Sequence, residues 1–224
     1  MDSEKFLRHL RRGPTRIVLL AATVGTVWAQ SPADEQAAQG IAALDGFLQD
    51  VHSLTAAFEQ ELWSADGTWL ERAVGTLSLK RPNRFYLDYQ TPIVQSLVTN
   101  GEELWIYDVE LSQATVTPLD QDVSASPAML LSGDQAARDS FDVIEDFFLD
   151  GADWVRLSPK RSGTDFRSVL IGFRDGLPRI LEFVNGLDQT TRMEFSDVVV
   201  NTDLDDSLFE FQVPPGVDVF GDDG

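Results

Sequence analysis

The segment from Gly75 to Leu119 constrains the fold most strongly, because it places several short strand-like runs, each with its own turn signal, in quick succession. Apolar and polar side chains alternate along these runs, which is the period-2 pattern of strands with one buried face. The dipeptide Asn100-Gly101 separates two of the runs and is a strong signal for a tight hairpin. This part of the chain therefore predicts an antiparallel meander.

Similar runs occur before and after this segment, separated by further Asp-Gly and Asn-Gly dipeptides. The predicted strands cover residues 54–59, 69–79, 84–89, 94–99, 103–107, 113–119, 154–158, 166–174, 179–184, 191–199 and 208–213. Residues 141–149 are ambiguous between helix and strand, but their aromatic and β-branched side chains favour a strand. The pattern indicates about eleven strands in all.

Two segments have helical patterns instead. Residues 34–50 place Ala37, Ile41, Leu44 and Leu48 on one face of an amphipathic helix. Ser126 and Pro127 have the residue types of a helix start before the short apolar run 128–131. Strands and a few helices give an α+β class. Periodicity does not distinguish a sandwich, a closed barrel and an open curved sheet.

The first 29 residues have the composition of an export signal. Ile17 to Val27 form an apolar stretch, and Val27-Trp28-Ala29 supplies small side chains at the usual cleavage positions. The basic residues before the stretch are Lys5, Arg8, Arg11, Arg12 and Arg16. A membrane anchor is the alternative, although a spanning helix needs about 20 apolar residues. We expect cleavage after Ala29, export of an unfolded chain to the periplasm, and a single domain over residues 30–224.

Charge and cysteine content narrow the classes of partner. The chain carries a formal net charge of −20, which argues against nucleic acid, whose binding depends on Lys and Arg. The same charge opposes adsorption to an anionic bilayer. The acidic residues either keep the protein soluble or help it to dock. The chain has no cysteine, so neither a disulfide nor a cysteine-linked lipid anchor can form.

Several predicted strands carry apolar side chains on both faces, as in Leu104 and Ile106 on one side and Trp105 and Tyr107 on the other. A sheet with one solvated face would alternate more regularly. Two interpretations remain open from these residues alone: an ordinary core with some exposed aromatic side chains, or a ligand cavity next to the sheet.

Separated motifs in the same order give the chain a family resemblance. They are Lys80-Arg81-Pro82-Asn83 with Phe85, then Trp105-Ile106-Tyr107-Asp108 with Leu111-Ser112-Gln113, and finally Pro214-Pro215-Gly216-Val217. Together they resemble the outer-membrane lipoprotein carrier family (LolA). Two turn residues depart from the family pattern, since Val109 replaces a common proline and Ser112 replaces an acidic residue.

The resemblance implies an incomplete, open antiparallel β-barrel with a helical lid over its apolar concave face. It also implies a periplasmic lipoprotein chaperone. Such a protein receives lipid-modified cargo from an inner-membrane lipoprotein-releasing ABC transporter and delivers it to an outer-membrane acceptor. Because that acceptor is anchored through a lipidated cysteine, a chain without cysteine corresponds to the soluble carrier. We expect a monomer that uses no cofactor or metal.

Site residues follow from the same resemblance. It implies that Arg81 bonds to backbone carbonyls near Leu48, Leu131 and Ser132 and so latches the empty carrier closed. Five guanidinium donors suit such a task; a solvated surface arginine is the alternative. The residues expected to line the hydrophobic cavity are Phe85, Leu87, Leu104, Ile106, Met129 and Leu130. For Phe85, plain core packing is the alternative.

Enzymatic function has little support in the sequence. His52 is the only histidine after the leader, and no G-x-S-x-G motif accompanies it, so we expect a surface histidine. The carboxylates Asp203, Asp205 and Asp206 lack the glycine of a calcium loop and indicate a solvated acidic turn. The remaining alternatives to a lipoprotein carrier are a general periplasmic lipid- or amphiphile-binding module and an interaction protein without a cavity.

Overall fold

The structure is a computed structural model that describes residues 39–119, 128–133, 135–161 and 166–221. All of these residues belong to one compact unit, Pro32–Gly224. The expected leader lies outside the described residues, as do residues 34–38 of the first expected helix and the expected helix start at Ser126 and Pro127.

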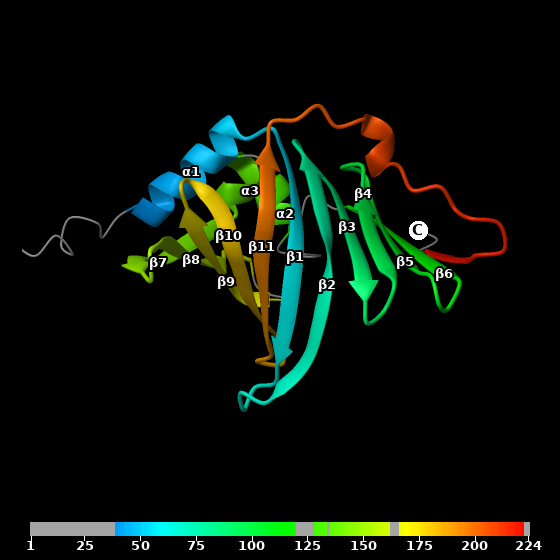
Figure 1. Ribbon diagram of the computed structural model, residues 1–224, viewed down its shortest axis with the longest axis horizontal. Helices are drawn as coiled ribbons and strands as arrows, with labels where there is room; N and C mark the ends of the chain where they lie inside the picture. Colours follow the sequence, from blue (N-terminus) through cyan, green and yellow to red (C-terminus); the bar gives the residue numbers. More distant parts are fainter. Residues whose placement is uncertain (1–38, 120–127, 134, 162–165, 222–224) are drawn as a thin grey trace, which may run out of the picture. The chain divides into compact units, whose positions relative to one another are not determined.

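Twelve strands form a single sheet in the described part of the chain (Figure 1). Their bounds are β1 Ser53–Trp63, β2 Trp69–Lys80, β3 Arg84–Thr91, β4 Gln95–Thr99, β5 Glu103–Asp108, β6 Gln113–Pro118, β7 Phe141–Leu149, β8 Ala152–Pro159, β9 Phe166–Arg174, β10 Leu177–Asn185, β11 Thr190–Val200 and β12 Asp218–Gly221. The order across the sheet is β12-β6-β5-β4-β3-β2-β1-β11-β10-β9-β8-β7.

The sheet does not close into a barrel, because β12 and β7 stand at opposite ends of this order. Its pairs are antiparallel except for β12, which runs parallel to β6. The predicted open antiparallel sheet and α+β class are therefore confirmed. The ambiguous segment Phe141–Leu149 is a strand, as its aromatic residues indicated.

The predicted last strand, residues 208–213, is wrong. This region contains a short 3₁₀ helix, η1 Asp206–Phe209, followed by irregular chain. Asp205 caps η1 by accepting a hydrogen bond from the backbone N–H of Ser207 at 2.9 Å, and Phe209 is buried with 1% of its surface exposed. This segment is therefore held by the helix cap at Asp205 and by the buried side chain of Phe209, and not by pairing with another strand. The final strand, β12, begins only after the turn at Gly216.

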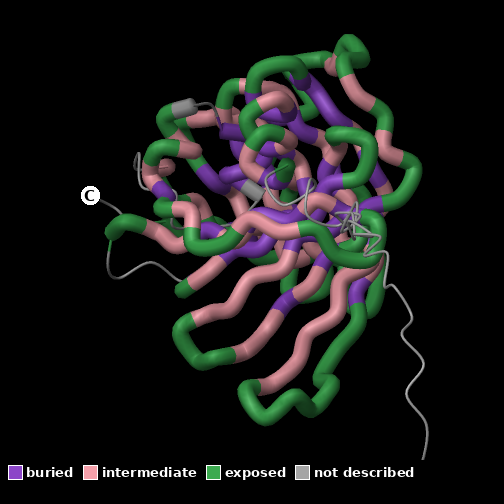
Figure 2. The backbone as a smooth tube through the Cα atoms, turned by 90° about the vertical axis from the view of Figure 1, so that its left-hand side faces the viewer, coloured by how far each residue is buried: buried purple, intermediate pink, exposed green. Residues whose placement is uncertain are grey.

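The described residues include three α-helices, which lie against the sheet: α1 Gln39–Asp50, α2 Ala128–Ser132 and α3 Gln135–Asp139. The apolar face of α1 is buried, as its helical spacing predicted, through Leu44, Phe47 and Leu48. Figure 2 shows burial concentrated where helices and sheet pack together, whereas the hairpins farther away are half-buried or exposed. No described helix is long and apolar enough to cross a bilayer.

Apolar residues on both faces of β5 have a structural explanation. Leu104 and Ile106 face the helices and belong to the main apolar cluster. Trp105 and Tyr107 alternate with them on the opposite face, where the ring of Phe211 lies 5.0 Å and 5.5 Å from their ring centroids. The C-terminal segment therefore covers β5 on its convex face at Trp105 and Tyr107. The double-sided pattern is not in itself the signature of a ligand cavity.

Candidate functional site

The concave face of the sheet begins with two rows of mainly apolar side chains. Cross-strand register sets these rows, because directly paired residues point to the same face. The row nearest the turn between β2 and β3 contains Leu54, Leu79, Phe85, Thr99 and Leu104. The next contains Ala56, Leu77, Leu87, Leu97 and Ile106. Four of the six expected cavity residues lie in these two rows.

The other two expected cavity residues, Met129 and Leu130, come from α2. They form one continuous apolar cluster with the two rows and with Leu44 and Phe47 of α1. Five of the six residues are buried, and Ile106 is half-buried against the same cluster. Each side chain of this size contributes about 1.5–3 kcal/mol when it leaves water. The structure therefore brings the six residues together beneath the helices.

Arg81 lies half-buried at the turn between β2 and β3 and bonds to backbone carbonyls of two helical segments. Its Nε donates to the carbonyl oxygen of Val51 at 2.6 Å, directly after α1 ends. One Nη donates to the carbonyl oxygen of Gly133, directly after α2 ends, and the other reaches that of Phe47 at 3.5 Å. The guanidinium carbon also lies 4.8 Å from the centroid of the Phe47 ring.

These acceptors flank the residues near which bonds were expected. Phe47 and Val51 lie on either side of Leu48, and Gly133 follows Ser132. The carbonyl oxygen of Ser132 accepts a hydrogen bond from the backbone N–H of Asn83, also in the β2–β3 turn, at 2.9 Å. Helix ends leave carbonyls without partners inside the helix, and this turn supplies the donors. The turn thus joins both helices to the sheet.

The opposite end of α1 is held by a carboxylate that the sequence analysis did not single out. Asp146 of β7 accepts hydrogen bonds from the backbone N–H groups of Gly40 and Ile41 at 2.9 Å and 3.4 Å. The helix has no acidic residue in its first turn and no basic residue in its last turn. The negative charge of Asp146 lies at the N-terminal end of α1 and the positive charge of Arg81 lies at its C-terminal end. Both charges therefore interact favourably with the helix dipole. Nothing in the local sequence around Asp146 indicates this contact.

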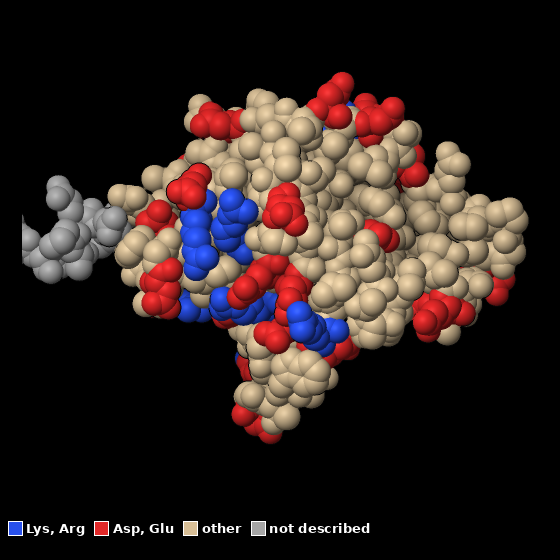
Figure 3. Space-filling model, in the orientation of Figure 1, with Lys and Arg blue, Asp and Glu red and all other residues tan. Residues whose placement is uncertain are grey.

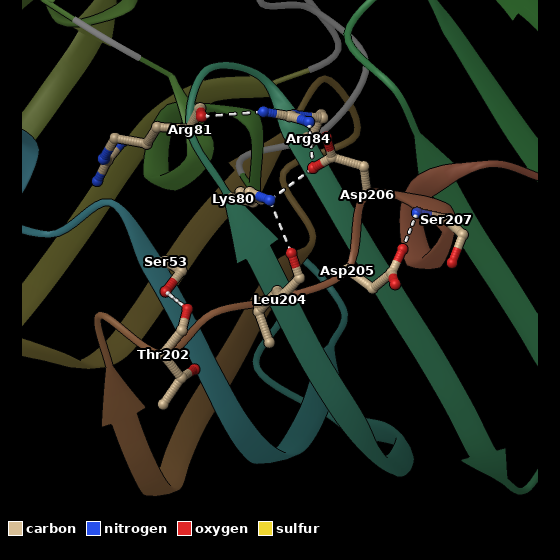
Figure 4. Close-up of polar contacts among 9 residues, drawn as sticks. All are labelled: Ser53, Lys80, Arg81, Arg84, Thr202, Leu204, Asp205, Asp206 and Ser207. Atoms are coloured by element: carbon tan, nitrogen blue, oxygen red, sulfur yellow. Dashed lines mark hydrogen bonds and ion pairs between the residues drawn. The ribbon is translucent and has the colours of Figure 1, made fainter.

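Figure 4 shows a second set of contacts, which ties the segment after β11 to the β2–β3 turn. The Nζ of Lys80 donates to the carbonyl oxygen of Leu204 at 2.7 Å and pairs with Asp206 at 2.5 Å. Arg84 pairs with the same carboxylate at 2.8 Å. Asp206 is exposed, but it is an anchor for the C-terminal segment and not only part of a solvated acidic turn.

This attachment should weaken in acid. Hydrogen bonding to Lys80 and the nearby charge of Arg84 lower the pKa of Asp206 below 3.8, and hydrogen bonds to Ser207 lower that of Asp205. A carboxyl whose pKa is lower in the folded state stabilises that state above its unfolded pKa. The contribution disappears as the pH falls through the lower, folded value. We therefore expect the segment to stay attached from pH 7 to about pH 4.

The NMR signal of the Phe211 ring reports this attachment, because that ring stacks on Trp105 of β5. It should keep its position until the pH falls below 3.8, the ordinary pKa of an aspartate, and then move. Asp206→Asn should shift the signal already at pH 7. A wild-type transition centred near pH 5 would contradict the assignment.

His52 is exposed, as expected, and its backbone carries the contacts that involve it. Its N–H donates to the side chain of Asn201 at 2.8 Å, and its carbonyl oxygen accepts from the N–H of Arg81 at 2.9 Å. Within the described ranges, no group of three or more acidic or histidine side chains is placed to hold a metal ion.

The charged side chains on the face drawn in Figure 3 are mixed, with Lys and Arg gathered around strands β9 to β11 and carboxylates among them. Arg192 pairs with Glu182 and Glu194, and Arg167 pairs with Asp188. Because carboxylates accompany the basic side chains, this face offers little to a polyanion.

Comparison with known proteins finds similar sequences over most of the chain. Residues 49–212 match the family model described as "Outer membrane lipoprotein carrier protein LolA". A protein of Pseudomonas paraeruginosa named outer-membrane lipoprotein carrier protein is 39% identical over 204 residues, 91% of this chain and 96% of the relative. Relatives with the same name from Pseudomonas aeruginosa and Halorhodospira halophila are 40% and 39% identical. They cover 84% and 80% of this chain, and 89% and 84% of their own lengths.

Proposed function

Because this chain belongs to the outer membrane lipoprotein carrier family, we propose that it shelters the acyl chains of lipoproteins while they cross the bacterial periplasm. The proposed carrier comprises residues 30–224, after removal of residues 1–29 as a signal peptide. The acyl chains would lie between the helices and the concave face of the sheet. The observation that carries this proposal is the joining of α1 and α2 to that face by one side chain, Arg81.

The mechanism is an exchange of apolar contacts. In the closed form, the side chains of α1 and α2 occupy the apolar face that acyl chains would cover. An entering chain recovers about 0.8 kcal/mol for each CH₂ that leaves water. This gain offsets the helix contacts and the Arg81 hydrogen bonds that opening breaks. Loading is therefore reversible, and no covalent step is needed.

We propose two protein partners on the basis of family membership. An inner-membrane lipoprotein-releasing ABC transporter supplies the cargo, and an outer-membrane acceptor removes it by offering a better apolar environment. The chain has no cysteine through which it could itself be lipid-anchored, which suits the diffusing member of this relay. The carrier acts as a monomer without catalysis, metal or cofactor.

The test is to recover the protein from periplasm and identify what co-purifies by mass spectrometry. Triacylated proteins in stoichiometric amounts support the lipoprotein carrier. Free lipids alone would instead favour a general periplasmic amphiphile-binding module. Neither class of ligand, even after mild cross-linking, would contradict both.

A further inference from the structure

On strands β1 to β5, the concave face changes from mainly apolar to partly polar with distance from Arg81, whereas on β11 to β9 it stays apolar through Phe195, Met193 and Leu181. Beyond the two apolar rows, the next cross-strand row contains Phe58, Gly75, Tyr89, Gln95 and Asp108. The register then places Gln60 opposite Ala73 and Leu62 opposite Glu71. Neighbouring rows are about 7 Å apart, because two residues separate them along each strand. The polar side chains thus follow directly after the apolar surface assigned to the acyl chains.

A cavity of about 190 Å³ lies among these polar side chains. It is lined by Gln60, Glu71, Tyr89, Gln95 and Asp108, together with Ala73 and the turn residues Pro92 and Ile93. This volume is too small for a lipid, since complete small-molecule sites measure about 300–1,000 Å³. It suits the polar end of a longer molecule whose chain continues beneath the helices.

Tyr89 stands at the boundary between the two regions. Its ring packs edge-on against Phe58, with centroids 5.1 Å apart, and it also contacts the main apolar cluster. Its hydroxyl donates to the side-chain oxygen of Gln60 at 2.9 Å. Burial, together with the charge of Glu71, raises the pKa of Tyr89 to about 12, so the phenol is neutral at pH 7. The boundary therefore presents uncharged hydrogen-bonding groups.

The charge at the cavity is negative. Glu71 and Asp108 both line it, and no Lys or Arg is among its lining residues. The carboxylate of Asp108 accepts the backbone N–H of Leu111 at 2.9 Å. Within the described parts of the chain, neither carboxylate has a Lys or Arg within ion-pair distance. An anionic group entering this cavity would meet two carboxylates without a compensating charge.

We propose that this cavity holds the polar head of a bound amphiphile and selects uncharged or cationic heads over anionic ones. The inference rests on the proposed function, because it assigns the acyl chain to the apolar rows beneath α1 and α2. A glyceryl ester joined to a peptide amide is an uncharged head that can bond to Tyr89, Gln60 and Gln95. A free fatty acid of the same chain length carries a carboxylate, which Glu71 and Asp108 repel. The cavity thereby separates acylated proteins from free fatty acids.

Three probes with twelve-carbon chains test the proposal: glyceryl monolaurate, dodecyltrimethylammonium and laurate, each measured by calorimetry below its micelle concentration at pH 7. We expect the first two to bind at least tenfold more tightly than laurate. A tenfold difference in affinity corresponds to about 1.4 kcal/mol. This free energy lies between the repulsion of two close unit charges in water and their stronger repulsion near a protein surface, where the effective dielectric constant is lower. The double variant Glu71→Gln, Asp108→Asn should bind laurate about tenfold more tightly and monolaurate within twofold of wild type.

A matched control is the double variant Glu61→Gln, Glu194→Gln, which removes two negative charges from the opposite, convex face. It should leave all three affinities within twofold. Equal affinity for the three probes in the wild type would overturn the head-group selection while leaving the carrier function intact. The head-group selection would also be overturned if the Glu71→Gln, Asp108→Asn variant bound laurate with unchanged affinity. This conclusion requires that the variant unfold on heating as cooperatively as the wild type. Failure of all three probes to bind would overturn the proposed function and this inference with it.

Discussion

Replacing Arg81 by leucine should shift the protein from its empty form towards its loaded form. The wild-type side chain donates to three backbone carbonyls and lies over the Phe47 ring, and these contacts belong to the closed arrangement. A hydrogen bond from a charged donor contributes about 1.5–3 kcal/mol, and neighbouring bonds do not add fully. A net loss of about 2 kcal/mol from the empty form would change the ratio of loaded to empty protein roughly 30-fold.

Equilibrium exchange of a fluorescent acylated peptide measures this ratio. Arg81→Lys should fall between the wild type and Arg81→Leu, because an ammonium group keeps the charge but cannot bridge the same carbonyls with a planar fork. Arg72→Leu is the control, since Arg72 is an exposed partner of Glu59 on β1, away from the helix contacts. Unchanged loading together with unchanged release in Arg81→Leu would exclude the latch.

Gly40→Ala should detach the first described turn of α1 from the sheet. A Cβ at this position would lie 2.3 Å from the backbone carbonyl oxygen of Trp154 in β8, where the backbone cannot yield without disturbing the strand. The same shift would weaken the two hydrogen bonds to Asp146. We expect the free energy of unfolding to fall by about 1–3 kcal/mol, the range for overpacking a well-filled interior.

Gly46→Ala is the matched control, because Gly46 belongs to the same helix and its added Cβ would meet nothing within 4 Å. Alanine is the better helix former, so this variant should gain about 0.5–1 kcal/mol. Chemical denaturation of both variants measures the difference. Equal stability changes of the same sign would mean that α1 is not packed against β8 as described.

The strands of the sheet could be predicted from the sequence because the signals for strands and turns lie within each short segment. Alternation and the dipeptides Asn100-Gly101, Asp150-Gly151 and Asp175-Gly176 indicate strands and turns without reference to distant residues. Three of the expected cavity residues, Phe85, Leu87 and Leu104, are buried for the same reason, since they sit at apolar positions of the strand pattern. The openness of the sheet did not follow from the pattern, and the family resemblance supplied it.

The local sequence pattern did not predict contacts between segments that are distant in the chain. Residues 208–213 alternate like a strand, yet the cap at Asp205 and the burial of Phe209 make part of them a 3₁₀ helix. Asp146 meets the start of α1 from more than one hundred residues away, which no local pattern reveals. The polar end of the concave face emerges only when cross-strand register places Tyr89, Gln95 and Asp108 in one row.

The central claim is that helix α1 and the sheet separate when cargo binds. The natural chain has no cysteine, so spin labels can be attached uniquely through Ala42→Cys on the exposed side of α1 and Glu194→Cys on the exposed side of β11. Their separation is then measured by pulsed electron paramagnetic resonance in empty protein and in protein shown by mass spectrometry to hold a triacylated lipoprotein. The account predicts a longer separation in the loaded sample. The same distance distribution in both samples would contradict it.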